Sequence, residues 1–304
     1  MKSTRGNGGS ATILMTLIAA VIVTVGLGFN WLVREHIQAS EGLKNKAEAI
    51  LKARSAFDTV IYLLLNGQIS WKEVILVGGT DITELKTLPL DGQKVSFSED
   101  LSVQIQESNG MLSLSSLNVV ALERLIRKVT GLDNVSGPIN SLLDWIDVDN
   151  LSRINGAEEF YYKGQGLPYV PRNYALQYKE EVGFIKGFEN GLYGKLQPYL
   201  TMLPSSGFNP NTASDAVLLA YLDINEESLK TLKEFMSKKA IASDIELFAL
   251  TGRWLGGEDN FYPSTFMEVT VRAGAPKSIY SIRAGLRVTQ NIYSPYSVIY
   301  WSEE

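Results

Sequence analysis

Residues 11–33 read ATILMTLIAAVIVTVGLGFNWLV, a run of 23 residues that contains no charged side chain. As an α-helix this run is about 35 Å long, which is enough to cross the roughly 30 Å hydrocarbon core of a bilayer. Lys2 and Arg5 precede the run, and basic residues favour the cytoplasmic side of a membrane segment. The sequence therefore predicts one transmembrane helix over residues 10–33, with its N-terminus in the cytoplasm and the remaining chain exported.

A cleaved secretory signal peptide is the alternative interpretation of this N-terminus. Such a peptide has an apolar stretch of about 7–15 residues followed by a cleavage site of small residues. Here the apolar run is longer and charged residues follow it, so a retained anchor is favoured. Gly8 and Gly9 suggest a different kind of processing, in which cleavage after Gly9 removes residues 1–9 as a leader and leaves Ser10 as the N-terminus. Otherwise the two glycines form only a flexible stub.

Composition excludes several function classes for the exported part, which has roughly 270 residues and suits one or two domains. The chain has no cysteine, so disulfides, thiolate metal sites and cysteine nucleophiles are excluded. The single histidine, His36, lies just after the apolar run, which excludes a histidine base or a multi-histidine zinc site in the exported body. The net charge of −5 does not favour nucleic-acid binding.

The helical period continues beyond the apolar run. From Val33 to Leu65 apolar residues recur at spacings near three, four and seven, and no proline interrupts residues 10–88. We therefore expect one helix of about 55 residues, roughly 80 Å long. Its second half is amphipathic and needs a globular domain to cover its apolar stripe.

Strand patterns occur on both sides of a helical block. Residues 94–107 alternate apolar and polar side chains around a turn, and the period of two returns over residues 266–301. An isolated hairpin is only marginally stable, so we expect these strands to form one small antiparallel sheet. The predicted fold class is α+β: the long N-terminal helix packs on a core of residues 34–109 and 264–304, and residues 110–263 form an α-helical domain inserted between strands.

Five segments of the inserted block are predicted to be short helices, and Ser214–Asp215 and Asn225–Glu226 offer capping residues at the starts of two of them. The five segments are residues 116–131, 137–148, 213–222, 226–239 and 241–252. Prolines punctuate the same block and limit the length of its helices. These prolines are Pro138, Pro168, Pro171, Pro198, Pro204 and Pro210.

Acidic residues are densest in residues 141–162, which read SLLDWIDVDNLSRINGAEEFYY. Six oxygen-bearing side chains fall within 16 residues: Asp144, Asp147, Asp149, Asn150, Glu158 and Glu159. Calcium takes six to eight oxygen ligands, and with Asp147 as position 1 the segment has Asp149 at position 3 and Glu158 at position 12. It is not an EF-hand, because Leu151 and Ser152 stand where that loop requires an oxygen ligand and a glycine. We therefore expect calcium in a different loop geometry.

Two other interpretations of the acidic segment stay open. One is a solvated acidic loop without a ligand. The other is a pair of catalytic carboxylates, as in glycoside hydrolysis, with Trp145, Tyr161 and Tyr162 stacking on a sugar, although aromatic residues beside an acidic loop are more often core. Asp144 lies in the apolar run LLDWI, where it is either a brace for the helix or loop or a ligand.

A second motif, at residues 207–218, reads GFNPNTASDAVL and places Asn209, Asn211 and Thr212 before a predicted helix. Such side chains shape turns by hydrogen bonding to nearby backbone. The segment is similar to the turn of helix-hairpin-helix modules that bind the DNA backbone. Residues 205–250 carry four lysines and seven acidic residues, however, which does not suit phosphate binding. We therefore expect a structural turn and no nucleic acid.

These segments together resemble the type II secretion system protein K family (GspK), the largest minor pseudopilins of bacterial type II secretion. The resemblance covers nearly the whole chain. The N-terminal GG–SATILMTLIAAVIV is similar to a prepilin-peptidase site followed by a pilin transmembrane helix. The other matching segments are the acidic segment, PYVPRNYALQYKEEVGFIKGF, KLQPYLTMLPSSGFNPNTAS and FYPSTFMEVTVRA. The acidic segment and NPNTAS, in this order after a pilin-like N-terminus, are the specific part.

The resemblance implies a pilin-like fold and a structural Ca²⁺ ion in the helical domain. The positions that match the family's ligands are Asp147, Asp149, Glu158 and Glu159. Cleavage between Gly9 and Ser10 would place Leu14 fifth in the mature chain, where most pilin-like subunits carry Glu and this family does not. That Glu would pair with the N-terminal amine of a neighbouring subunit, so its absence fits a subunit at the tip of the filament.

The expected function is therefore non-enzymatic. The resemblance implies a minor pseudopilin at the tip of the pseudopilus, bound to two others (GspI- and GspJ-like), processed by the prepilin peptidase and anchored by one span in the bacterial inner membrane with a periplasmic C-terminal domain. One alternative is a membrane-anchored periplasmic carboxylate-dependent hydrolase, whose catalytic carboxyl groups should face an open cleft instead of converging on one ion. Another is a related minor pilin of a DNA-uptake or type IV pilus machine.

Overall fold

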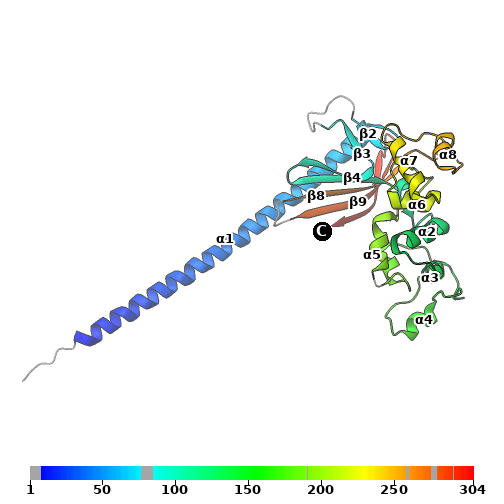
Figure 1. The fold of residues 1–304 in the computed structure, drawn as a ribbon. Helices are drawn as coiled ribbons and strands as arrows, with labels where there is room; N and C mark the ends of the chain where they lie inside the picture. The colour runs from blue at the N-terminus through cyan, green and yellow to red at the C-terminus, as the bar shows by residue number, and fades with distance from the viewer. Residues whose placement is uncertain (1–7, 77–84, 190, 258–259, 275–278, 290) are drawn as a thin grey trace, which may run out of the picture.

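A single long helix projects from a globular body (Figure 1). The computed structural model describes residues 8–76, 85–189, 191–257, 260–274, 279–289 and 291–304 of the 304-residue chain. The long helix, α1 (Gly8–Asn66), has 59 residues and continues without a break through Gly26, Gly28 and Gly42. The prediction of one helix that includes both the apolar run and the amphipathic stretch is confirmed.

The main sheet has five antiparallel strands in the order β10-β9-β8-β5-β4. They are β4 (Asp91–Ser98), β5 (Leu101–Glu107), β8 (Phe266–Ala273), β9 (Tyr280–Val288) and β10 (Tyr296–Glu303). β5 pairs directly with β8, and Val103 lies opposite Val271, although the whole helical block separates the two strands in sequence. The α+β fold class, with a helical domain inserted between strands of one sheet, is confirmed.

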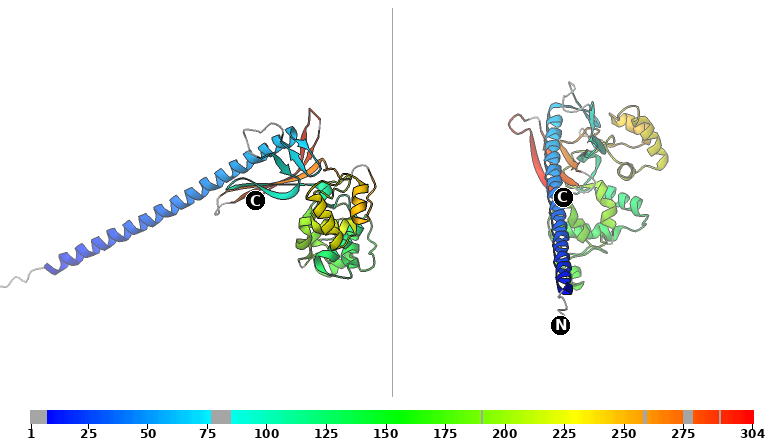
Figure 2. Two further views of the ribbon diagram at one scale, coloured as in Figure 1. Left: turned by 45° about the horizontal axis from the view of Figure 1, so that its top comes forward. Right: turned by 90° about the vertical axis from the view of Figure 1, so that its left-hand side faces the viewer.

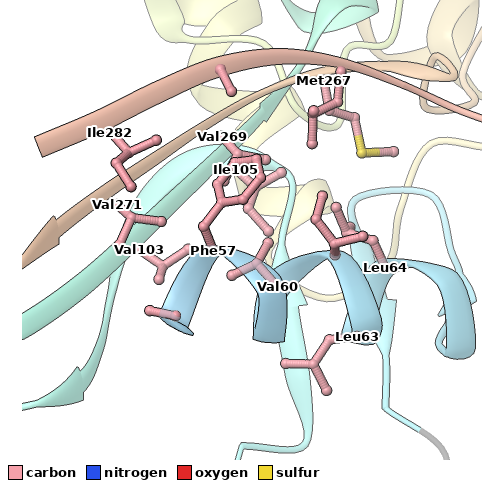
Figure 3. Packing of buried hydrophobic residues seen from close by; sticks show 14 of the residues in the cluster. Phe57, Val60, Leu63, Leu64, Val103, Ile105, Met267, Val269, Val271 and Ile282 are labelled. Carbon is pink, nitrogen blue, oxygen red and sulfur yellow. The ribbon is translucent and has the colours of Figure 1, made fainter. Parts of the chain in front are cut away.

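The second half of α1 packs on one face of this sheet (Figure 3). Its buried residues follow the helical period: Ala49, Ala53, Ala56, Phe57, Val60, Ile61, Leu63 and Leu64. The residues that they meet alternate along the strands: Val103 and Ile105 on β5, Val269 and Val271 on β8, and Ile282 on β9. Burial of each large side chain contributes about 1.5–3 kcal/mol, so this contact is what holds the helix against the sheet.

The first half of α1 is a candidate membrane anchor. Among the described residues, one helix, Ala11–Asn66, is long and apolar enough to cross a membrane by length and composition. Its most apolar 18-residue window has a mean hydropathy of 2.4, and none of that window is buried. Residues 1–7 of the expected leader, which include Lys2 and Arg5, lie outside the described residues, and α1 begins at Gly8.

All five helices predicted in the inserted block are present. They are α2 (Val119–Thr130), α3 (Ser136–Ile146), α6 (Asp215–Leu222), α7 (Glu226–Met236) and α8 (Asp244–Thr251). Five further helices were not predicted from the sequence: α4 (Glu159–Gly164), α5 (Leu192–Leu196) and the 3₁₀ helices η1 (Ser108–Gly110), η2 (Lys179–Phe184) and η3 (Gln197–Tyr199). Each of these is too short to show an apolar period.

Two small sheets were not expected either. β1 (Gln68–Ile69), β2 (Glu73–Ile75) and β3 (Thr87–Pro89) form an antiparallel sheet after α1, and β6 (Leu112–Ser113) pairs in parallel with β7 (Leu200–Thr201). Strands of two or three residues carry no detectable alternation, so only the folded chain identifies them.

The inserted helices build two hydrophobic cores of their own. One cluster gathers buried residues of α2, α3 and α5, and the other gathers those of α6, α7 and α8. The inserted domain lies at the end of the body remote from the N-terminus of α1 (Figures 1 and 2). This arrangement leaves the apolar half of α1 and the inserted domain at opposite ends of the molecule.

Candidate metal centre

Two helix ends bring part of the acidic segment together. α3 ends at Ile146, and Asp144 and Asp147 are three residues apart, so they lie on one face of its final turn. Glu158 is the residue that precedes α4 and has extended backbone torsions (φ −112°, ψ −178°). The intervening loop returns so that one carboxylate oxygen from each of Asp144, Asp147 and Glu158 lies within 4.8 Å of the other two.

Asp144 holds this loop in place. Its side chain is fully buried, and its Oδ2 accepts backbone N–H bonds from Ala157 at 2.8 Å and from Arg153 at 3.2 Å. Gly156 is required beside it, because a methyl group at that position would overlap Asp144 Oδ2. Asp144 is therefore a loop brace, one of the two roles left open by the sequence, and it also belongs to the converging acidic group.

Several oxygens of the acidic group have no hydrogen-bond partner. Glu158 is only 4% exposed, yet neither of its carboxylate oxygens accepts a hydrogen bond. Oδ1 of Asp147 is also buried and unpartnered. Buried polar atoms are almost always paired, since an unpaired buried charge is strongly unfavourable. The group therefore has acceptor capacity directed inward that the described residues do not use.

Electrostatics in the group oppose the ionised form of Glu158. Burial, and to a smaller extent the negative charges of Asp144, Asp147 and Asp149, together raise the pKa of Glu158 to about 7. The positive charge of Arg153 acts in the opposite direction. A cation placed among these carboxylates would remove the repulsion that raises the pKa of Glu158.

Among the described ion pairs, Arg153 is the only basic residue that contacts any of the three carboxylates, and it contacts two of them. Its Nη1 lies 2.8 Å from Asp144 Oδ1 and also donates to Asp147 Oδ2. These two carboxylates raise the pKa of Arg153 above its ordinary value. The guanidinium group thus neutralises part of the acidic group and leaves the Glu158 oxygens unpaired.

The donor set fits a hard divalent cation such as Ca²⁺, which takes carboxylate and carbonyl oxygens as ligands. Asp147 Oδ1 and both Glu158 oxygens are available, and Asp144 lies within reach of them. The unpartnered oxygens of a side chain as buried as Glu158 are the observation that supports this fit. A bound ion would satisfy these oxygens, which accept no hydrogen bond.

The four ligand positions implied by resemblance separate into two pairs. Asp147 and Glu158 belong to the converging group. Asp149 is exposed, and its Oδ1 accepts the backbone N–H of Leu151 at 2.8 Å, which closes a turn. Glu159 begins α4 and forms an ion pair with Lys163 one turn later in that helix. A ligand role for Asp149 and Glu159 stays a prediction.

Arg153 was not predicted from the sequence, and the sequence allowed two roles for Asp144. A signal existed for Asp144, because its spacing of three from Asp147 places both on one face of a helix. No local signal pointed to Arg153, since its contact with the carboxylates depends on how the loop after α3 returns.

The second motif lies inside the molecule. Asn209 is fully buried, and its Nδ2 donates to the carbonyl of Trp71 at 2.9 Å. Asn211 Nδ2 donates to Asn209 Oδ1 at 3.0 Å and to the carbonyl of Ile241 at 2.9 Å. Thr212 donates its hydroxyl hydrogen to a second buried segment, the end of β5. These side chains are used in folding, so they are not available to nucleic-acid phosphates.

Comparison with known proteins places this site within a family. A model of the family described as Type II secretion system (T2SS), protein K, matches residues 100–205, which run from β5 past β7 and include all three converging carboxylates. Over these residues the chain is similar to this family, whose members are components of a secretion machine, and the predicted resemblance is confirmed.

Curated relatives carry the same description over different lengths. Type II secretion system protein K of Aeromonas hydrophila is 25% identical over 257 residues, which cover 79% of this chain and 78% of the relative. The protein of that name from Pectobacterium carotovorum subsp. carotovorum is 33% identical over 100 residues, which cover 32% of this chain and 30% of the relative. The chain thus matches about a third of the length of the Pectobacterium relative.

A solved structure shares the fold. One chain in the crystal structure of the GspK-GspI-GspJ complex from the enterotoxigenic Escherichia coli Type 2 Secretion System has a TM-score of 0.52 and 17% sequence identity to this chain. The match covers 90% of this chain and 99% of that one. The likeness at this identity establishes the common fold.

Proposed function

We propose that this chain is a minor pseudopilin that initiates assembly of the type II secretion pseudopilus and remains at its tip, without enzymatic activity. The observation that carries this proposal is the family match over residues 100–205, combined with a fold shared with a chain of the GspK-GspI-GspJ complex. In this proposal the long helix α1 contacts the other subunits, and the sheet and the inserted domain form the tip of the pseudopilus.

The partners would be two smaller pseudopilins, GspI- and GspJ-like, that pack along α1. Beyond the apolar run, α1 still exposes Ile37, Leu43 and Leu51, of which Leu43 is 72% and Leu51 68% exposed. Large apolar side chains on the uncovered face of a helix favour association with other helices. Around Leu51, the other side of the helix, which carries Ala49 and Ala53, already packs in the core that α1 shares with the sheet.

A tip position follows from two features of the chain. The inserted domain lies at the end of the body remote from the N-terminus of α1, where a further subunit of a filament would have to stack (Figure 2). Leu14 would be the fifth residue after cleavage, so the chain lacks a charge there to pair with a subunit beyond it. Both features favour a terminal position in the filament.

Processing and location follow from the N-terminus. We infer that prepilin peptidase cleaves between Gly9 and Ser10 on the cytoplasmic side. The apolar half of α1 would then be the single span in the bacterial inner membrane, with the body in the periplasm. The unburied apolar window of α1 supports a membrane environment, and the basic residues Lys2 and Arg5 support the orientation.

The acidic group would hold a structural Ca²⁺ ion. Asp144, Asp147 and Glu158 would be its carboxylate ligands, and the ion would fix the loop between α3 and α4 in a domain that has no disulfide. A hydrolase is less well supported, because the carboxylate oxygens converge within 4.8 Å and two of the three residues are buried. Catalytic carboxylates would instead border a space open to substrate.

Reconstitution of the tip complex tests the proposal. The full-length protein in detergent micelles is mixed with the organism's other small pilin-like proteins, with and without calcium, and the products are separated by size and identified by mass spectrometry. A stable complex with two of them is expected. A folded protein that binds none of them contradicts the proposed role and returns attention to the acidic group as a catalytic site.

A further inference from the structure

The positive charge inside the acidic group has a consequence for any ion that binds there. Arg153 Nη1 contacts Asp144 Oδ1 at 2.8 Å and also Asp147, so the guanidinium group uses two of the three converging carboxylates. We propose that Arg153 is an internal counter-cation that must withdraw before a divalent ion binds, and that it thereby sets the ion affinity of the site. This inference rests on the proposed calcium role.

The geometry makes the two cations competitors. Ca²⁺ ligand oxygens lie at about 2.3–2.6 Å from the ion. Asp144 Oδ1 already faces the guanidinium group, and its Oδ2 is bonded to the backbone of Ala157. Asp144 can therefore turn an oxygen toward an ion only if Arg153 Nη1 leaves Oδ1. Like charges held this close in a partly buried site repel strongly, so shared occupancy is disfavoured.

The exposure of the loop allows Arg153 to withdraw. Its side chain is 39% exposed, whereas the Asp144 side chain that it contacts is fully buried. The neighbouring residues Leu151 and Ile154 are 78% and 83% exposed, so the tip of the loop is not packed into the core. Arg153 can turn its charged end into water while its backbone N–H stays on Asp144, since long basic side chains readily place their charge in solvent.

In the ion-free protein, Arg153 stabilises the acidic group through its ion pairs with Asp144 and Asp147. The three carboxylates carry a formal charge of −3 when ionised, and Arg153 brings this to −2. Removal of the arginine would leave the buried Asp144 without its ion pair, which destabilises the ion-free protein. The same removal would leave a more negative and less obstructed site, which strengthens ion binding. Removal of Arg153 should therefore lower the stability of the ion-free protein and raise its affinity for the ion. If Arg153 formed only a structural salt bridge, its removal would lower stability without raising ion affinity.

Calcium titration of matched variants tests the inference. Full-length wild type, Arg153→Gln and Arg127→Gln are compared in detergent micelles by isothermal titration calorimetry with Ca²⁺ and by thermal unfolding in EDTA. Arg127 is the control, because it forms a 2.7 Å ion pair with Glu123 at a similar exposure of 44% but lies on α2 outside the acidic group. Arg153→Gln should bind calcium about tenfold or more tightly than wild type and unfold at a lower temperature in EDTA. Arg127→Gln should match wild type in affinity.

The outcomes separate this inference from the calcium role. Equal or weaker calcium affinity in Arg153→Gln, with calcium bound by wild type, overturns the inference and leaves the calcium role standing. No calcium binding by any of the three proteins overturns both. If Arg153→Gln does not fold in EDTA, recovery of its unfolding transition on addition of Ca²⁺ supports the inference, and failure to recover overturns it.

Discussion

The side chain of Thr212 donates a hydrogen bond to the carboxylate of Glu107, and both residues are buried although 105 positions separate them in sequence. Glu107 ends β5, and Thr212 lies just before α6. The other oxygen of Glu107 accepts the backbone N–H groups of Asn109 at 2.8 Å and Ser264 at 2.7 Å. One carboxylate therefore joins the chain leaving the sheet, the inserted domain and the chain returning to β8.

The Glu107 carboxylate should make stability depend on pH. Burial outweighs the hydrogen bonds from Thr212, Ser264 and Asn109, and the net effect raises the pKa of Glu107 from the usual 4.5 to about 7. Because the folded chain keeps the proton at a pH where the unfolded chain has lost it, stability falls as pH rises from about 4.5 to about 7 and is constant above. The pKa difference corresponds to a loss of roughly 3 kcal/mol in this window.

Glu107→Gln should remove this contribution. The amide keeps an acceptor for the two backbone N–H groups and can donate to Thr212, whose hydroxyl has the carbonyl of Asn209 as another acceptor at 3.4 Å. Between pH 5 and pH 8 the wild type should lose about 2–3 kcal/mol of stability relative to the variant, because only the wild type has a carboxylic acid at this position. Unfolding followed by tryptophan fluorescence at both pH values measures it, and a difference that does not change with pH refutes the assignment.

Gly156→Ala should damage the loop that holds the acidic group. The added methyl group would overlap Oδ2 of the buried Asp144, whose hydrogen bonds to the loop backbone leave it little freedom to move. We expect a loss of about 1–3 kcal/mol. Gly164→Ala at the end of α4 is the matched control, because nothing lies within 4 Å of its added methyl group. Thermal unfolding distinguishes them, and equal stability of the two variants would show that the loop can relax around Asp144.

The two faces of α1 should respond differently to the same substitution. Leu63 is 1% exposed in the hydrophobic core around α1, and Leu63→Ala should cost about 2–5 kcal/mol of stability. Leu51 is 68% exposed, so Leu51→Ala should change stability by less than about 0.5 kcal/mol. If the exposed face binds other pseudopilins, Leu51→Ala should instead weaken the complex in a binding assay. Normal binding by this variant would argue against that face as the contact.

Gly9→Val should block maturation. The proposed peptidase site requires a small residue before the cut, and a branched side chain there would hinder cleavage between Gly9 and Ser10. The expected product is the full-length precursor, detected by intact-mass measurement of the protein isolated from membranes. A mature chain that begins at Ser10 in the variant would refute the assigned cleavage point.

The elements predicted well are those whose pattern is local. The period of α1 and the alternation along β8 and β9 are visible in the sequence, because side-chain direction repeats every 3.6 or 2 residues along each backbone. The insertion was also predictable, since strands on both sides of a helical block need each other to form a stable sheet. Short elements such as the helix α4 and the two-residue strand β6 were not predicted, because they contain too few residues to show a repeating apolar pattern.

The acidic segment was visible from the sequence, which gave its composition, its spacing and the likeness to a family. The tertiary structure decided which residues meet: Asp144, Asp147 and Glu158 converge, Arg153 enters the group, and Asp149 and Glu159 have local partners. The same is true of Glu107, because its contacts with Thr212 and Ser264 join residues more than a hundred positions apart. Periodicity is set by neighbouring residues, whereas the pairing of a buried charge depends on the path that the whole chain takes around it.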